Sequence, residues 1–525
     1  MSLQWWQGAV VYQVYPRSFK DSNSDGIGDL EGLRSKLPYL AELGVDAIWI
    51  SPFFKSPMRD YGYDIADFKQ VDPLFGTMVD FDRIVEDAHK LGLKIIIDQV
   101  YSHTSNEHDW FQESRSSRQS TKADWYVWAD AKPDGTPPNN WQSLFAGAAW
   151  TWDARRQQYY LHNFLSEQPD LNLLNPDVQD AVLDVLKFWL DRGVDGIRVD
   201  AVSHFTHDPN LTDNPPRESG GVRTRPVDFQ SLKYNSERPE TLEFLERMRS
   251  VIDQYPGRFA VGEIGGPDLA ERGMADYLSD RRLHTAYSFD FLRGGDLSPH
   301  LIRKTVQQWL SRHPNCWPTW VFSNHDAPRA ITRWHSQQDP HVLAVGLNAL
   351  LFSLRGSVCL YQGEELGMPQ AEVPFECLKD PEAIANWPLT LGRDGARTPI
   401  IWSSTERFGG FSESAPWLPI DPKQIDAAAD RQMGNPNSVL EQTKHLLKLR
   451  QQSAALKWGS IAFDVETATE LQFTRCYNGE QVHCYYNLGH EPTQGLSPSG
   501  YRAIAGVECG KIVQPGGFQW AVAIG

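Results

Sequence analysis

The feature that most constrains the fold is a regular alternation of predicted strands and helices over most of the chain. Short apolar strands are predicted at residues 10–15, 45–50, 94–97, 196–199, 259–262, 320–322 and 358–360. Amphipathic helices are predicted between them, for example at residues 30–43, 80–91, 176–192 and 240–254. Strands that alternate with helices form a parallel sheet. About eight such units fit before residue 456, so we expect an α/β fold, a (β/α)8 TIM barrel.

Two segments interrupt the alternation, and the last part of the chain abandons it. Residues 103–172 are too long for a loop and predict a small inserted domain, domain B, after the third strand. Residues 205–239 are expected to form a long loop over the site. Short strands flanking the Asn478-Gly479 turn predict an all-β end. We therefore expect a barrel of residues 1–102 and 173–455, an inserted domain of residues 103–172 and a C-terminal β-sandwich domain of residues 456–525.

Composition limits the classes of binding partner and the cellular compartment that we expect. The net charge of −17 argues against nucleic acid or an anionic membrane and favours a neutral, polar substrate. The 19 Trp and 18 Tyr residues suit sugar faces, but they are equally typical of a core. The six cysteines show no metal-like spacing and are expected to be free thiols. Without a recognisable signal peptide or a long apolar run, the chain is predicted to be cytoplasmic.

Arg198 and Asp200 stand two residues apart where a buried strand is predicted to end. Because side chains alternate along a strand, both should point to the same side and share one pocket. The nearby positive charge should lower the pKa of Asp200 and keep it ionised, as a carboxylate nucleophile requires. The alternative is a structural Arg–Asp pair at a strand end.

Ionisable residues recur at the ends of the other predicted strands, where a (β/α)8 barrel carries its active site. Those expected to meet there are Asp98, His103, Arg198, Asp200, Glu263, His325 and Asp326. Each has an ordinary structural explanation when taken alone. Together they are the groups that the cleavage of an acetal requires. In that reaction one carboxylate attacks and one acid protonates the leaving oxygen.

Residues 21–29 carry oxygen-bearing side chains at every second position. Asp21, Asn23, Asp25 and Asp29, with the carbonyl of Ile27, could surround a structural Ca²⁺ or Mg²⁺. The loop is not an EF-hand, because its twelfth position is a glycine where an EF-hand needs a bidentate Glu. The alternative is a solvated turn rich in Asp and Asn.

The strand-end residues resemble the four ordered motifs of the α-amylase superfamily, glycoside hydrolase family 13. The motifs are Asp98-Gln-Val-Tyr-Ser-His103, Gly196-Ile-Arg-Val-Asp200, Gly262-Glu263 and Phe322-Ser-Asn-His-Asp326. Gln168-Pro-Asp-Leu-Asn172 and the loop at residues 21–29 further resemble the α-glucosidase and oligo-1,6-glucosidase branch. Ser102 stands where the family usually has the Asn that binds calcium in amylases, so a calcium between barrel and inserted domain is not expected.

The resemblance implies a role for each matched residue. Asp200 would be the nucleophile, Glu263 the general acid/base and Asp326 the stabiliser of the transition state. The sugar-binding residues would be Asp60, Tyr63, His103, Phe145, Phe164, Arg198, His325 and Arg393. The expected protein is a retaining, exo-acting α-glucosidase, monomeric or homodimeric, that hydrolyses and transglucosylates small α-glucosides. Ala201, beside the nucleophile, leaves room for an α-1,4-linked ring.

Two alternatives stay open. The chain could be a dedicated glucosyltransferase, or a sucrose- or α-1,6-acting member of the same family, because hydrolysis and transfer share one covalent intermediate. A non-catalytic sugar-binding homologue is the other alternative, and the three intact carboxylates argue against it.

Overall fold

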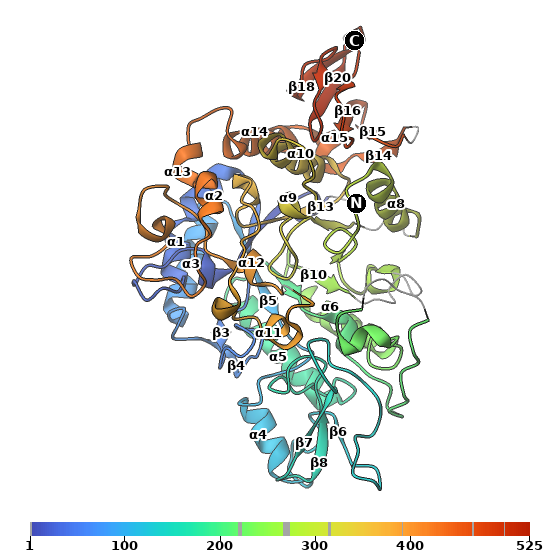
Figure 1. Ribbon diagram of the computed structural model, residues 1–525. Helices are drawn as coiled ribbons and strands as arrows, with labels where there is room; N and C mark the ends of the chain where they lie inside the picture. Colours follow the sequence, from blue (N-terminus) through green and yellow to red (C-terminus); the bar gives the residue numbers. More distant parts are fainter. Residues whose placement is uncertain are drawn as a thin grey trace.

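A closed sheet of eight parallel strands forms the centre of the molecule (Figure 1). The structure is a computed structural model that describes residues 3–218, 223–265, 274–312, 317–390, 392–464, 467–497 and 499–524. The strand order is β11-β10-β9-β5-β2-β1-β13-β12. The hydroxyls of Thr285 on β11 and Thr319 on β12 are 2.8 Å apart, so the two edges meet and close the predicted barrel. The eight strands are β1 Val10–Val14, β2 Ala47–Ile50, β5 Lys94–Gln99, β9 Gly196–Val199, β10 Phe259–Ile264, β11 Thr285–Ser288, β12 Thr319–Val321 and β13 Ser357–Tyr361.

Helices cover the outside of this sheet, and the strands are buried on both faces. Every residue of β1, β2, β9 and β13 is buried, as expected for parallel strands between an inner core and an outer helical layer. None of the helices in the described ranges is long and apolar enough to cross a membrane. The longer helices are α3 Met78–Lys90, α5 Pro176–Asp191, α6 Glu240–Ile252, α8 Pro299–Arg312, α10 Pro340–Ser353 and α14 Val439–Gln452. Shorter ones are α9 Ala330–Arg333, α11 Pro381–Asn386, α12 Asp394–Arg397, α13 Ala429–Gln432 and α15 Ala454–Trp458.

Three local predictions are wrong. The single helix predicted over residues 30–43 is two helices, α1 Leu30–Ser35 and α2 Leu37–Leu43, because Pro38 has no N–H with which to continue the first one. The strands β5 and β10 run through Asp98 and Glu263, which the sequence analysis places just after them. In addition, strand β11 was not predicted, because four residues are too few to show the alternation of a strand.

The chain between β5 and α5 leaves the barrel and builds a small sheet of its own. It contains helix α4 Asp109–Ser116 and strands β6 Trp128–Ala129, β7 Trp150–Asp153 and β8 Gln158–Leu161, in the order β6-β8-β7. Trp141 and Trp150 stack in a separate apolar cluster under this sheet. A short hairpin, β3 Phe54–Lys55 and β4 Asp67–Val71, precedes it. The predicted boundaries of the inserted domain, residues 103 and 172, stay predictions.

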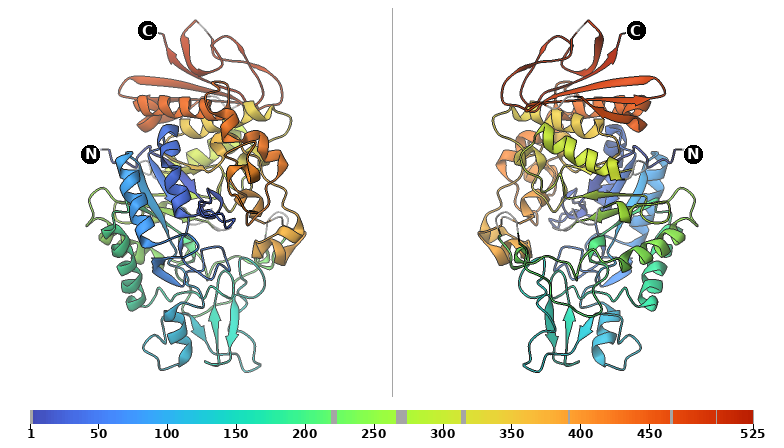
Figure 2. Two further views of the ribbon diagram at one scale, coloured as in Figure 1. Left: turned by 90° about the vertical axis from the view of Figure 1, so that its left-hand side faces the viewer. Right: turned by 90° about the vertical axis from the view of Figure 1, so that its right-hand side faces the viewer.

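The C-terminal part is all-β and lies at the opposite end of the molecule from the inserted segment (Figures 1 and 2). Its larger sheet has the order β14-β15-β16-β20-β18, and β17 pairs with β19. Cys476 pairs with Gln481 across the hairpin, and the five cysteines in the described ranges are free, as expected. Cys316 lies outside those ranges. The strands are β14 Ser460–Phe463, β15 Glu470–Tyr477, β16 Glu480–Asn487, β17 Thr493–Gln494, β18 Tyr501–Gly506, β19 Ile512–Val513 and β20 Phe518–Ala523.

Candidate active site

Arg198 holds three carboxyl groups together at the carboxyl end of the barrel strands. Its Nη1 lies 2.6 Å from Asp98 Oδ1 and 2.5 Å from Asp200 Oδ1. Its Nη2 lies 2.7 Å from Glu263 Oε1. These residues come from the neighbouring strands β5, β9 and β10, or from the residue directly after β9. Arg198 and Asp200 therefore point to the same side, as the alternation of side chains along β9 predicts.

Burial and the neighbouring charges shift the pKa values of Asp200 and Asp98. Burial raises the pKa of Asp200 well above its usual value, Arg198 opposes that rise, and the charges of Glu263 and Asp98 add to it. The predicted influence of Arg198 is present but outweighed, so the expectation of a lowered pKa for Asp200 is wrong. Burial also raises the pKa of Asp98 to about 6. The charge of one guanidinium is shared among its carboxyl partners, so it does not offset the effect of burial on the pKa of Asp200 and Asp98.

Asp326 has different partners and the opposite shift. Arg397 Nη2 and Arg393 Nη1 lie 2.9 Å and 3.4 Å from Asp326 Oδ1, and His325 Nε2 lies 3.2 Å from its Oδ2. Burial alone would raise the pKa of Asp326, but His325 and the two arginines outweigh it and hold that pKa well below its usual range. Burial lowers the pKa of His325 to about 3. Near neutral pH the arginines therefore supply the positive charge, and Asp326 is a fixed anion.

A pocket of about 540 Å³ contains the three carboxyl groups of Asp200, Glu263 and Asp326. Two residues assigned to sugar binding, Arg198 and His325, are buried and do not line it. Each contacts a lining residue instead, and His325 Nε2 lies 2.7 Å from Tyr63 Oη. The other assigned residues do line the pocket: Asp60, Tyr63, His103, Phe145, Phe164 and Arg393.

One wall of the pocket is an ion pair between Asp60 and Arg393. Arg393 Nη2 lies 2.8 Å from Asp60 Oδ1 and 2.7 Å from Asp380 Oδ1. The guanidinium also lies over the ring of Phe145, 4.8 Å from its centroid. Gln168 Nε2 donates to the other oxygen of Asp60 at 3.2 Å. The wall thus combines fixed hydrogen-bonding groups for hydroxyls with an aromatic ring for the apolar face of a sugar.

Tyr287, on β11, belongs to the site although no prediction from the sequence includes it. Its hydroxyl accepts a hydrogen bond from Arg198 Nη2 at 2.8 Å and donates one to Glu263 Oε1 at 3.2 Å. The backbone N–H of Ala201 donates to Glu263 Oε2 at 3.1 Å, so both oxygens of Glu263 are held. No motif marks Tyr287, because its strand is short and its partners are distant in sequence. Arg397, in α12, and Asp380, directly before α11, were also not assigned from the sequence; they act here through their contacts with Asp326 and Arg393.

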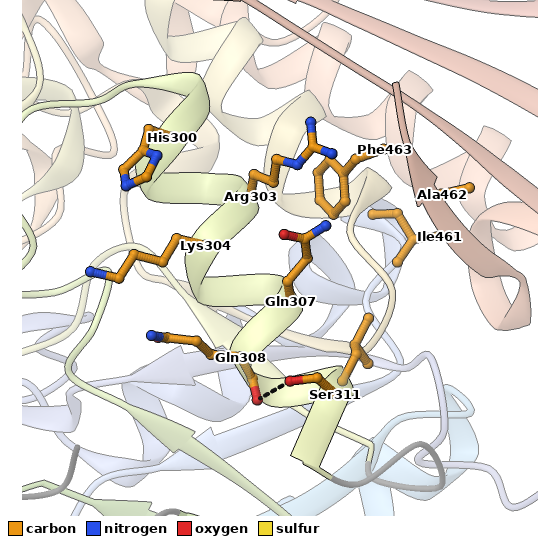
Figure 3. A pocket seen from close by; sticks show the side chains of 10 residues that line it. His300, Arg303, Lys304, Gln307, Gln308, Ser311, Ile461, Ala462 and Phe463 are labelled. Atoms are coloured by element: carbon orange, nitrogen blue, oxygen red, sulfur yellow. Dashed lines mark hydrogen bonds between the residues drawn. The ribbon is translucent and has the colours of Figure 1, made fainter. Parts of the chain in front are cut away.

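A second hollow, of about 760 Å³, lies between α8 and β14 (Figure 3). Arg303 of α8 lies there over the ring of Phe463, 5.8 Å from its centroid. None of the described residues that line this hollow is a carboxylate, so it lacks the groups that cleave an acetal. The candidate active site is the pocket at the mouth of the barrel.

The loop at residues 21–29 folds back on itself through its own side chains. Asp21 Oδ1 accepts from the N–H groups of Asn23 and Ser24 at 2.9 Å and 2.7 Å, and Asp25 Oδ1 accepts from Ile27 at 2.8 Å. Within the described part of the chain, no three His, Cys, Asp or Glu side chains are grouped as metal ligands. The geometry is that of an Asx-rich turn, and the Ca²⁺ or Mg²⁺ stays a prediction.

Carboxylates at the carboxyl ends of barrel strands, gathered in one pocket, define the class of the protein as a glycoside-cleaving barrel enzyme. Known proteins agree with this assignment. Residues 13–459 match the family described as alpha amylase, catalytic domain. A probable alpha-glucosidase of Rhizobium meliloti (strain 1021) is 50% identical over 497 residues, 93% of this chain and 90% of that protein. The oligo-1,6-glucosidase of Parageobacillus thermoglucosidasius is 37% identical over 523 residues, 94% and 92% of the two chains.

A solved structure gives the same answer. The crystal structure of the alpha-glucosyl transfer enzyme XgtA is 49% identical and superposes with a TM-score of 0.95 over 100% of both chains. This chain therefore belongs to the α-amylase family, glycoside hydrolase family 13, and is a glycoside hydrolase or glucosyl-transferring enzyme of that family.

Proposed function

We propose that the protein is a retaining, exo-acting α-glucosidase that acts on short α-glucosides. One observation carries the proposal: Arg198 holds Asp200 and Glu263 on its two terminal nitrogens, in a pocket with a buried wall at Asp60 and Arg393. Two neighbouring carboxyl groups suit a double-displacement reaction. A walled pocket suits the terminal residue of a glucoside better than the middle of a chain.

The reaction assigns one step to each carboxyl group. Asp200 attacks the anomeric carbon while Glu263 donates a proton to the departing oxygen, which leaves a glucosyl group covalently bound to Asp200. Glu263 then takes a proton from water or from an acceptor hydroxyl, whose oxygen displaces Asp200. Asp326, held anionic by Arg393 and Arg397, stabilises the positive charge that develops on the sugar.

The second candidate is a dedicated glucosyltransferase of the same family. It is favoured by the likeness to XgtA, whose crystal structure is that of an alpha-glucosyl transfer enzyme. The two candidates share the covalent intermediate and differ in whether water or another hydroxyl compound attacks it.

The test is an assay of the wild type on a nitrophenyl α-glucoside and on maltose, with products followed at high sugar concentration. Free glucose as the main product supports the hydrolase, and oligosaccharides as the main product support the transferase. Glu263→Gln should lose about 10²- to 10⁴-fold of kcat on maltose and much less on the nitrophenyl substrate, whose leaving group needs no acid. Full activity of this variant on maltose would contradict the role of Glu263.

We further propose a preference for α-1,4 bonds and a structural divalent ion at residues 21–29. The small side chain of Ala201 supports the first, and the spacing of oxygen-bearing side chains supports the second. A chelator should lower the melting temperature and leave the turnover of the still-folded enzyme largely unchanged. Lost turnover at an unchanged melting temperature would contradict a structural ion.

We also propose a cytoplasmic location. The free state of the five cysteines in the described ranges supports it.

A further inference from the structure

Two loops that carry opposite charges meet at the rim of the pocket. Arg225 belongs to the segment between β9 and α6, and Glu382 belongs to α11, which follows β13. Their side chains, 22% and 15% exposed, form an ion pair with 3.4 Å between Arg225 Nη1 and Glu382 Oε1. Both residues line the pocket that holds Asp200 and Glu263. They are more exposed than those carboxyl groups, at 9% and 8%, so the pair lies farther toward solvent.

The topology of the barrel fixes the direction of this ion pair. In the strand order β11-β10-β9-β5-β2-β1-β13-β12, the strands β9 and β13 are four positions apart. In a closed ring of eight, positions four apart are opposite each other. A contact between the loops that follow β9 and β13 therefore crosses the mouth of the barrel.

Further hydrogen bonds tie the same two loops to the inserted segment. Arg225 Nη1 also donates to the carbonyl of Leu144 at 3.3 Å, and its Nη2 lies 3.2 Å from Asp228 Oδ1. From the other side, Asn386 Nδ2 of α11 donates to the carbonyl of Phe145 at 2.8 Å. Three segments that are distant in sequence thus converge on the ion pair and hold it over the pocket.

We infer that Arg225 and Glu382 form a crossbar that sets the length of glucoside the enzyme accepts. This inference rests on the proposed function. A substrate that ends near the crossbar leaves the ion pair intact, whereas a longer chain must displace Arg225 or Glu382 to leave the pocket. The ion pair is partly exposed, and its distance of 3.4 Å is longer than the contacts of Arg198 with its carboxylates. A substrate can therefore break it at a cost in free energy. Short glucosides are then favoured over long ones without any change at Asp200 or Glu263.

The test compares maltotetraose with maltose as substrates. Glu382→Gln removes one charge with almost no change in shape, and Arg225→Gln removes the other charge with a shorter side chain. Each should raise the ratio of kcat/KM for maltotetraose to that for maltose by about 10-fold. The double variant should gain no more than the better single variant, because either change breaks the same pair. Arg223→Gln is the matched control: Arg223 lies over the ring of Phe229, does not line the pocket, and should leave the ratio within about twofold.

The dependence on salt provides a second measurement, made on the wild type with Glu382→Gln as the reference. Raising the ionic strength from 0.05 M to about 1 M screens a partly exposed ion pair, so the ratio should rise in the wild type and not in Glu382→Gln. If the ratio of kcat/KM for maltotetraose to that for maltose is unchanged in both variants and in salt, while maltose is still cleaved, the crossbar is contradicted. The proposed function is not affected by that result. A wild type that acts on no α-glucoside overturns the proposed function itself.

Discussion

Arg198 serves three carboxyl groups at once, and Tyr287 is the residue that separates their environments. Asp98 and Asp200 share one guanidinium nitrogen, whereas Glu263 receives the other nitrogen, the Tyr287 hydroxyl and a backbone N–H. The two carboxyl groups of the proposed catalytic pair therefore have different hydrogen-bond donors, although both contact Arg198.

Tyr287→Phe should lower kcat/KM on maltose by roughly 10- to 100-fold. The change removes the hydrogen bond to Glu263 and the two from Arg198, and the expected loss corresponds to about 1.4–2.7 kcal/mol of transition-state stabilisation. Tyr485→Phe is the control, because the Tyr485 hydroxyl donates to Thr493 within the C-terminal part and Tyr485 does not line the pocket. A Tyr287→Phe enzyme within twofold of the wild type would show that Arg198 alone positions Glu263.

Ala201→Val should shift the ratio of α-1,4 to α-1,6 cleavage toward α-1,6 by about 10- to 200-fold, mostly through lost maltose activity. Valine adds bulk beside the nucleophile, where Ala201 lines the pocket. Ala201 also has a φ of 42°, a left-handed backbone in which a β-branched residue is strained by about 1–3 kcal/mol. Ala201→Gly relieves the backbone without adding bulk and should keep the wild-type ratio. A wild type that prefers isomaltose would contradict this role of Ala201.

At the scale of elements, Asp170 holds the two ends of the inserted segment together. Its backbone forms a bridge with His103, and its buried carboxyl group accepts hydrogen bonds from the backbone and side chain of Asn163. Burial raises the pKa of Asp170 to about 8. Folding therefore favours the protonated form, and this stabilisation is complete below the unfolded pKa of about 4 and is lost as pH rises toward 8.

Asp170→Asn, which cannot ionise, should gain stability relative to the wild type as pH rises. The difference in the free energy of unfolding should grow by up to about 1.4 kcal/mol per pH unit between about pH 4 and pH 8, and then level off. Urea unfolding at pH 5 to 9 measures it. Asp109→Asn controls for removal of an exposed charge from the same segment. A difference that does not change with pH would show that Asp170 is ionised throughout this range.

On the scale of the whole molecule, buried arginines connect the C-terminal sheet to the barrel. Arg475 of β15 donates to the carbonyls of Ser353, Gly459 and Ser460 at 2.5, 2.8 and 3.1 Å. Arg450 of α14 donates to the carbonyls of Gly8 and Gly356. These contacts satisfy carbonyl groups at the ends of separate elements, so the sheet and the barrel stabilise each other.

Arg475→Met should lower the free energy of unfolding by about 2 kcal/mol or more, because the two buried carbonyls of Ser353 and Gly459 lose their donor at about 1–3 kcal/mol each. The kcat of the folded enzyme should not change, since Arg475 does not line the pocket. Arg431→Met, at an exposed surface pair, should stay within about 0.5 kcal/mol of the wild type. Thermal and urea unfolding, with activity measured in parallel, test both. Equal stability of Arg475→Met and wild type would contradict the coupling.

The barrel could be predicted because its signals are local. Buried strands such as residues 196–199 appear in the sequence as runs of small and β-branched residues, and amphipathic helices lie between them. The split at Pro38 was also predictable, because a proline inside a helical pattern has no N–H and ends the helix before it. Strand β11 was not predictable, because it depends on pairing with β10.

The sequence by itself determined which residues stand at the strand ends, because alternation along a strand and the direction of a parallel sheet are properties of the local chain. It placed Asp200, Glu263 and Asp326 in one pocket without knowledge of any contact. Only the tertiary structure decided the pKa shifts of Asp200 and Asp326, the placing of Arg198 and His325 behind the pocket wall, and the ion pair between Arg225 and Glu382. Those depend on burial and on distances between residues far apart in the chain, which no local pattern encodes.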